Sequence, residues 1–305
     1  MNSPALTVII CTHRPRSDYL TRTLAGLQHQ GKPTSDWELI VVDNASPDPV
    51  AADLDLSWHP AARIIVESEL GLTAARLRGI GEAAAPLLVF VDDDNILAPD
   101  YLERALARAG AWPMLGVFGC GNYDPEWEQV PAAGFEPYTA YLAVHRIPRD
   151  RWSNQAFDYP AIPAGAGLCA RASVARHYAA QVLGDPRRKK LGRTGANLSG
   201  CEDFDLALTA IDLGFGVGVF RDLGLTHLMP KERVAEAYLL QLVEGHAYST
   251  VILHALRDPE MRPPGMGFAA RLREFRLRHA LDPIPLRIHD ARRRGEARAW
   301  TDLSR

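Results

Sequence analysis

The segment "LLVFVDDDNILAPDYL", Leu87 to Leu102, combines an aliphatic run, three consecutive aspartates and a proline that opens a helix-forming stretch. The aliphatic run (86–92) predicts a buried strand, because it is rich in β-branched and aromatic residues and ends in charge. The following "PDYLERALARAG" (99–110) predicts a helix with proline in its first turn. This part of the chain is therefore a strand followed directly by a helix, with acidic side chains between them.

The same alternation of strand and helix continues on both sides of this segment. Strands are expected at 6–11, 38–44, 62–67, 115–122, 216–222 and 224–228, and helices at 18–30, 73–84, 171–183, 201–214 and 233–256. Such alternation indicates a mainly parallel central sheet with helices on both faces, a Rossmann-like α/β fold. The Trp-, Tyr-, Pro- and Gly-rich segment 123–163 is expected to form loops that line a site. We expect an α/β domain over 1–230 and a helical, Arg-rich extension over 231–305.

The composition is that of a globular protein without a strong global charge. The chain has 305 residues, 47% of them hydrophobic, and a formal net charge of -3, so no nucleic-acid partner is expected. The four cysteines are far apart and form no Cys-x-x-Cys pair, which argues against a zinc ribbon and a disulfide framework. No segment approaches the roughly 20 apolar residues of a membrane span, and no signal-peptide pattern is present, so we expect a cytoplasmic protein.

The three aspartates lie where ligands dock in open α/β sheets, beyond the carboxyl end of a strand. Adjacent carboxylates repel one another, and a divalent cation relieves that repulsion. Asp92 and Asp94 are two residues apart and can point to the same side, while Asp93 points away, toward supporting groups or solvent. Such oxygen ligands with open positions suit Mg²⁺ or Mn²⁺. The alternative is a favourable acidic cluster at a helix N-terminus, which explains one or two of the carboxylates.

A second polar group follows the strand at 38–44, where Asp43 and Asn44 begin the segment "DNASPD". These two residues could simply form a turn. However, the first strand ends with Thr12 and Arg14 nearby in the sequence, and the helix at 73–84 contains Arg76. Hydrogen-bond donors, cations and carboxylates at one sheet edge suit a ligand that has both a base and a diphosphate.

These motifs resemble the family-2 glycosyltransferases with the GT-A fold. The resemblance covers roughly residues 5 to 228, and its motifs occur in the family's order: "TVIICTHRP", "ELIVVDNAS", "GLTAARLRGI", "VFVDDDNILAPDYL", "GCEDFDLALTAIDLGF" and "LTHL". Two positions depart from the family pattern. Leu77 stands where many members have Asn, and Asn95 stands where many have a further Asp.

The resemblance implies roles for individual residues. Asp43 would accept a hydrogen bond from the base, and Asp94 would coordinate a metal that bridges the diphosphate. The metal ligands implied are Asp94, Asp92 and His227. The nucleotide-sugar-binding residues implied are Thr12, Arg14, Asp43, Asn44, Arg76, Asp92 and Asp93.

Sugar transfer passes through an oxocarbenium-like state and needs a general base for the acceptor hydroxyl. The resemblance points to Asp203 as that base, with Glu202 beside it, and to inversion at the anomeric carbon. A charge cluster at a helix N-terminus would account for both acids equally well. The segment "AIPAGAGLCAR" (161–171) has small residues that let a backbone approach a ligand closely, or that form tight turns.

The implied donor is a nucleoside-diphosphate sugar and the implied acceptor a saccharide or lipid-linked hydroxyl, in glycan or polysaccharide biosynthesis. Asp43 favours UDP, since it suits the ring N–H of uracil; dTDP and GDP stay open. From residue 260 onward there are eleven Arg against six Asp plus Glu, which fits peripheral contact with an anionic membrane face, packing on the catalytic domain, or a homodimer contact. A non-catalytic nucleotide-sugar-binding subunit is the main alternative. A nucleotidyltransferase is a weaker one, because the N-terminal loop lacks a Gly- and Lys-rich phosphate motif.

Overall fold

The computed structural model describes residues 3–52, 54–195, 197–263, 265 and 267–304. The strands are β1 (Leu6–Thr12), β2 (Trp37–Asn44), β3 (Ala62–Glu67), β4 (Leu87–Asp92), β5 (Asn95–Leu97), β6 (Leu115–Trp127), β7 (Arg151–Ser153), β8 (Leu168–Arg171) and β9 (Gly216–Met229). The α-helices are α1 (Ser17–Gln28), α2 (Leu72–Glu82), α3 (Tyr101–Ala111), α4 (Ala172–Gly184), α5 (Pro186–Lys189), α6 (Glu202–Asp212), α7 (Glu236–Arg257), α8 (Phe268–Ala280) and α9 (Pro283–Leu303). The 3-10 helices are η1 (Thr34–Asp36), η2 (Val50–Ala52), η3 (Glu136–Leu142), η4 (Tyr159–Ala161) and η5 (Lys231–Val234).

The described strands form one sheet in the order β3-β2-β1-β4-β8-β6-β9-β5, with β7 paired to β9. β1 lies parallel to both β2 and β4, so Thr12 is opposite Asp43 and Cys11 is opposite Asp92. Three carboxyl ends therefore meet at one edge of the sheet. A turn at residues 93–94 then leads the chain into β5, where Asn95 pairs with His227 of β9.

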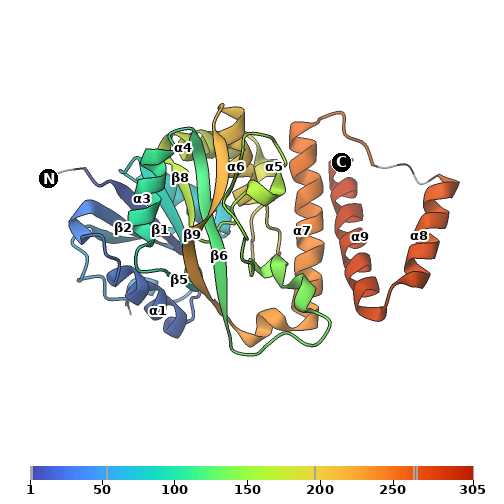
Figure 1. Cartoon of the computed structure of the whole chain (residues 1–305), viewed down its shortest axis with the longest axis horizontal. Coiled ribbons are helices and arrows are strands. Elements are labelled where there is room, and N and C mark those ends of the chain that lie inside the picture. The colour runs from blue at the N-terminus through green and yellow to red at the C-terminus, as the bar shows by residue number, and fades with distance from the viewer. Residues whose placement is uncertain (1–2, 53, 196, 264, 266, 305) are drawn as a thin grey trace.

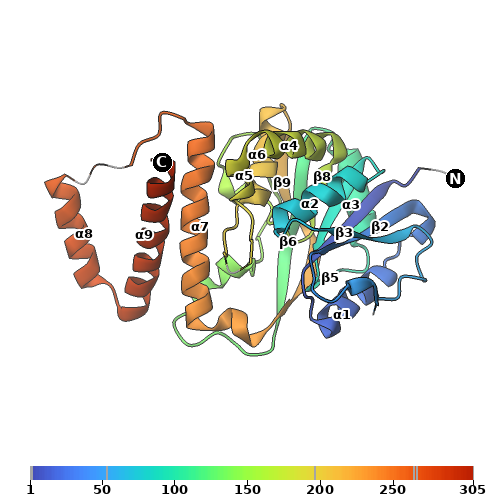
Figure 2. The ribbon, with the colours of Figure 1, turned by 180° about the vertical axis from the view of Figure 1, so that it is seen from behind.

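Helices cover both faces of the sheet. Alternate residues of β1 enter two hydrophobic cores: Val8 packs with helices α1 and α3, and Ile9 packs with α2, α4 and α6. Figure 1 shows α1 and α3 on the near face, and the reverse view in Figure 2 brings α2 to the front. Because both faces are buried, the parallel strands are continuous hydrophobic runs rather than alternating ones.

The expected α/β fold class with a helical extension is confirmed, and the differences concern short elements. β9 is one long strand where the sequence indicated two, and α3 begins at Tyr101 rather than at Pro99. β7, η3 and η4 all lie in the segment 123–163 that was expected to form loops. β8 is only four residues long. It lies between β4 and β6 and pairs antiparallel with both.

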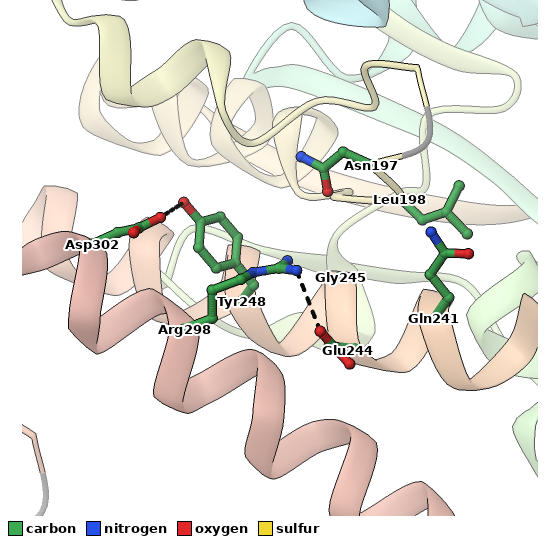
Figure 3. A pocket seen from close by; sticks show the side chains of 8 residues that line it. All are labelled: Asn197, Leu198, Gln241, Glu244, Gly245, Tyr248, Arg298 and Asp302. Carbon is green, nitrogen blue, oxygen red and sulfur yellow. Dashed lines mark hydrogen bonds and ion pairs between the residues drawn. The ribbon is translucent and has the colours of Figure 1, made fainter.

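The C-terminal helices pack on each other through polar and close backbone contacts. Tyr248 Oη donates to Asp302 Oδ2 at 3.0 Å, and Arg298 Nη1 donates to Glu244 Oε1 at 3.3 Å, across a pocket between α7, α9 and residues 197–198 (Figure 3). α8 lies at the outer end of the extension in both overall views (Figures 1 and 2), and its Phe268 is 83% exposed. Within the described ranges, no helix has the length and apolar character needed to cross a bilayer.

We expect Gly295→Ala to loosen the packing of α9 on α7. A Cβ at Gly295 would lie 2.1 Å from the Glu244 carbonyl oxygen, so the helices must separate. The expected loss is about 2 kcal/mol in the free energy of unfolding, measured by urea denaturation. Gly110→Ala in α3 is the matched control, because a Cβ there meets no atom within 4 Å and alanine favours the helix. Equal stability of the two variants would show that the helices do not pack this closely.

Candidate active site

The three aspartates at the end of β4 face three different partners. The Asp92 side chain is 36% exposed, and its Oδ1 lies 3.5 Å from Arg76 Nη2. The Asp93 carboxylate accepts a hydrogen bond from Thr12 Oγ1 on β1. Burial, together with the neighbouring Asp94 carboxylate, raises the pKa of Asp93 to about 7. Asp93 is therefore half-buried, and its bond with Thr12 ties the turn to β1.

Asp94 is buried between β5 and β9. Its Oδ2 lies 2.8 Å from Arg233 Nη1, its Oδ1 lies 3.6 Å from His227 Nε2, and Asn95 Nδ2 donates to the same Oδ1 at 2.8 Å. Burial alone would raise the pKa of Asp94, but Arg233 and His227 outweigh it and hold that pKa below its usual range. Asp94 is thus a carboxylate that stays ionised next to two basic side chains.

The donor atoms around Asp94 have the chemistry of a divalent-cation site. A carboxylate oxygen and an imidazole nitrogen, both acceptable ligands for Mn²⁺, converge at Asp94 and His227. Asp92 faces Arg76 instead, and within the described residues no three acidic, His or Cys side chains are grouped closely enough to hold a metal ion. Arg233 already neutralises Asp94, so a cation that binds there must compete with this guanidinium.

Asp43 and Asn44 shape the loops beside the acidic turn. The Asp43 carboxylate accepts from the backbone N–H groups of Ser46 at 3.1 Å and Val50 at 3.0 Å. Asn44 Nδ2 donates to the Glu69 carbonyl at 2.7 Å, and its Oδ1 accepts from the Gly71 N–H. Asp43 and Asn44 therefore form the turn that was one of their two expected roles. The contact of Asp43 with a nucleotide base stays a prediction.

Arg14 lies in the adjoining loop between β1 and α1 and is exposed. Its backbone has the left-handed φ of 50°, and its N–H donates to Ser46 Oγ at 3.0 Å. This bond connects the loop after β1 to the loop after β2. Arg14 therefore lies at the same sheet edge as Thr12 and Asp43 and is exposed to solvent.

The second acidic pair lies at the N-terminus of α6 and is connected to the first through Arg76. Arg76 Nη1 lies 3.0 Å from Glu202 Oε1, and both side chains are buried. Burial and the adjacent Asp203 charge raise the pKa of Glu202 to about 7, although Arg76 acts in the opposite direction. Glu202 Oε2 has no hydrogen-bond partner among the described residues, which fits a carboxyl group that is readily protonated.

Asp203 is oriented by backbone groups on both sides. Its Oδ2 accepts from the Gly165 N–H at 2.8 Å, and its Oδ1 accepts from the Phe204 N–H at 2.8 Å. Burial raises its pKa, which brings a carboxylate closer to the range of an efficient general base at neutral pH. A Cβ at Gly165 would lie 2.5 Å from Arg76 Nη2, so this glycine makes room for the guanidinium.

Two arginines of the site were not anticipated from the sequence. Arg233 lies in η5, six residues after His227, and Arg193 lies in the segment between α5 and α6. The Arg193 charge lowers the pKa values of Asp94, Glu202 and Asp203, although other effects dominate at each group. Neither arginine belongs to a motif quoted above. The sequence signal that could have indicated Arg233 as a site residue is its position soon after "LTHL".

The mainly parallel sheet, with the acidic turn at its carboxyl edge, agrees with the GT-A fold class expected from the sequence. Residues 7–147 match the family model described as Glycosyl transferase family 2. The match places this N-terminal part of the chain in glycosyl transferase family 2.

Relatives and solved structures agree with this assignment. The chain is 37% identical over 128 residues to validoxylamine A glucosyltransferase of Streptomyces hygroscopicus subsp. jinggangensis (strain 5008), covering 40% of this chain and 30% of that one. It is 29% identical over 130 residues to the putative glycosyltransferase EpsH of Bacillus subtilis (strain 168), covering 42% and 36%. The matched segment thus spans about a third of these curated relatives.

Two solved structures resemble the whole chain in fold. The mannosyltransferase PcManGT from Pyrobaculum calidifontis, in complex with GDP-Man and Mn²⁺, aligns with a TM-score of 0.57 at 19% identity, over 99% of this chain and 76% of that one. S. aureus TarS 1–349 aligns with a TM-score of 0.50 at 15% identity, over 98% and 89%. At these identities the likeness confirms the GT-A fold.

We expect the protonation of Glu202 to appear in the pH dependence of stability. Its folded pKa of about 7 lies above the ordinary value of 4.5, so the folded state binds the proton more tightly. The contribution of Glu202 to the free energy of unfolding is fully present below about pH 4.5. It is lost as the pH rises toward 7, by up to about 1.4 kcal/mol per pH unit. In Glu202→Gln that loss disappears, which urea denaturation between pH 4.5 and 8 measures.

Glu260→Gln is the control, because the Glu260 side chain is 89% exposed. Its stability should follow the wild-type curve over the whole pH range. If Glu202→Gln also follows the wild-type curve, Glu202 is ionised throughout and the raised pKa is wrong.

Proposed function

We propose that this protein is an inverting, metal-dependent glycosyltransferase that transfers a sugar from a nucleoside-diphosphate sugar to a hydroxyl acceptor. The observation that supports this most directly is the position of Arg76. Its guanidinium lies within 3.5 Å of Asp92 at the acidic turn and 3.0 Å from Glu202 at the start of α6. A donor-binding end and a candidate base are therefore adjacent at one sheet edge.

The leaving diphosphate needs positive charge around it, and the site supplies several cations. Arg76, Arg193 and Arg233 act on the carboxylates of this edge and would face a diphosphate bound there. A divalent cation, Mn²⁺ or Mg²⁺, would be held by Asp94 and His227, with Asp92 at the end of β4, and would neutralise the leaving group when bound. Cation binding at Asp94 would free the Arg233 guanidinium for other anions.

Asp203 would take the proton from the acceptor hydroxyl. Two backbone N–H groups fix the direction of its carboxylate, and burial raises its pKa toward the working range of a base. Attack from the face opposite the departing diphosphate inverts the anomeric centre. Glu202 would act by holding Arg76 in place.

We also propose finer assignments for the donor, the acceptor and the extension. UDP is the favoured donor nucleotide through Asp43, while the GDP-Man bound to PcManGT keeps GDP open alongside dTDP. A saccharide or lipid-linked acceptor in glycan or polysaccharide synthesis fits the family. A cytoplasmic location, with peripheral contact to the inner membrane face through α8, and a homodimer are further proposals for the extension.

We expect Asp203→Asn to abolish transfer while nucleotide binding persists. The isosteric amide keeps one of the two backbone hydrogen bonds through its oxygen but cannot accept a proton, so kcat should fall by about 10²–10⁴-fold. Asp100→Asn is the control, because Asp100 is 46% exposed and pairs only with Arg104 among the described residues. Turnover is measured as nucleotide release from donor sugars, with and without acceptor. A protein that binds nucleotide but shows no turnover even as wild type would instead be the non-catalytic subunit.

A separate test concerns the metal. The measurement is a thermal-shift screen of UDP, dTDP, GDP and CDP, each with and without Mn²⁺. One nucleotide should raise the Tm of the protein more when Mn²⁺ is present, since only a ligand of the folded state raises Tm. Asp94→Asn should remove the Mn²⁺-dependent part and leave the Mn²⁺-independent part. If the Mn²⁺ effect is unchanged in Asp94→Asn, Asp94 is not a metal ligand.

A further inference from the structure

A cavity of about 420 Å³ lies between the sheet domain and the C-terminal helices. Its volume is within the range of about 300–1,000 Å³ usual for small-molecule sites. Both parts of the chain build it, since its walls come from η3, η4, the start of α6, α7 and α9. The lining side chains that matter here are Tyr141, Tyr159, Phe204, His246, Arg292 and Glu296.

The cavity reaches the first turn of α6, which also carries the candidate base. Cys201 and Phe204, which line it, are the residues on either side of Glu202 and Asp203 in the chain. The Phe204 N–H donates to Asp203 Oδ1 at 2.8 Å, so the backbone of a lining residue also orients the base.

The walls combine aromatic faces with uncharged polar groups. The rings of Tyr159 and Phe204 are 5.7 Å apart, and those of Tyr141 and His246 are 5.5 Å apart. Such rings offer apolar surface with a polar edge, which suits a ring compound that has C–H faces and hydroxyl edges. Arg292 and Glu296 pair with each other at 3.1 Å, so this wall offers hydrogen bonds with little net charge.

His246 has the properties needed for binding hydroxyl groups. Neither ring nitrogen has a hydrogen-bond partner among the described residues, although the ring lines the cavity. Burial, assisted by Arg193, lowers its pKa to about 4, so the ring is neutral at physiological pH. A neutral imidazole donates from one nitrogen and accepts at the other, which matches a hydroxyl better than a phosphate.

We propose that this cavity binds the acceptor as a neutral saccharide ring, and that η3, η4, α7 and α9 thereby determine acceptor specificity. The inference rests on the proposed glycosyl transfer with Asp203 as base. The C-terminal extension is then part of the substrate-binding surface, and its helices contribute His246, Arg292 and Glu296 to one wall.

The test is direct binding of p-nitrophenyl α- and β-glycosides of glucose, galactose, mannose and N-acetylglucosamine to the full chain. Saturation-transfer NMR at pH 7 detects binding, with the nucleotide of the thermal-shift screen present. At least one glycoside should bind the wild type. Tyr141→Ala and His246→Ala should each weaken it at least tenfold, while nucleotide binding and acceptor-independent donor hydrolysis stay within about twofold. Tyr141→Phe should retain most of the affinity, because the ring remains.

Trp152→Ala is the matched control, since Trp152 is 52% exposed on β7 and does not line the cavity. Loss of binding in this control as well, or equal binding by all variants, would overturn the cavity as the acceptor site. Nucleotide binding without binding of any glycoside would overturn the inference and leave the proposed function intact. Absence of nucleotide binding in the wild type would overturn the proposed function, and the inference with it.

Discussion

The organisation of this site depends on the buried guanidinium of Arg76. A cation in a nearly dry position is stable only with paired carboxylates, and Arg76 has Asp92 on one side and Glu202 on the other. Its placement depends on two glycines. A Cβ at Gly79 would lie 2.5 Å from Ile9 Cγ2, so its absence lets α2 approach β1 closely, and Gly165 leaves room for the guanidinium itself.

Much of the fold was predictable because buried parallel strands have a strong local signal. β1, β2 and β4 are aliphatic runs buried on both faces that end in polar residues, and the sequence places each within a residue or two. β5 and β8 were missed for a physical reason. They have three and four residues, and partners far away in the chain determine their conformation: Asn95 pairs with His227, and Cys169 with Val89.

Some residues of the candidate site could likewise be predicted from the sequence, and others could not. The carboxylates that follow strands or begin helices could be named from the sequence, because parallel topology brings strand ends to one edge. Their partners could not. Arg233 lies in η5, just after β9, and reaches Asp94 across the chain. The separate surroundings of Asp92 and Asp94 arise from a turn in which neighbouring side chains diverge. Spacing alone indicated that these two acids would face the same way.

In the Arg-rich extension, the number of arginines is larger than the number of guanidiniums that remain without an ion-pair partner. Most guanidiniums of α9 are neutralised within the fold: Arg287 pairs with Glu236, Arg294 and Arg298 pair with Glu244, and Arg292 and Arg293 pair with Glu296. The pairs with Glu236 and Glu244 join α9 to α7, while those with Glu296 lie within α9; the pairs between the helices help to maintain one wall of the cavity. Within the described part of the extension, the arginines without an ion-pair partner lie on α8, next to its exposed phenylalanines: Arg271, Arg273 and Arg276. Any attraction to an anionic surface therefore belongs to α8, while α9 serves the architecture of the site.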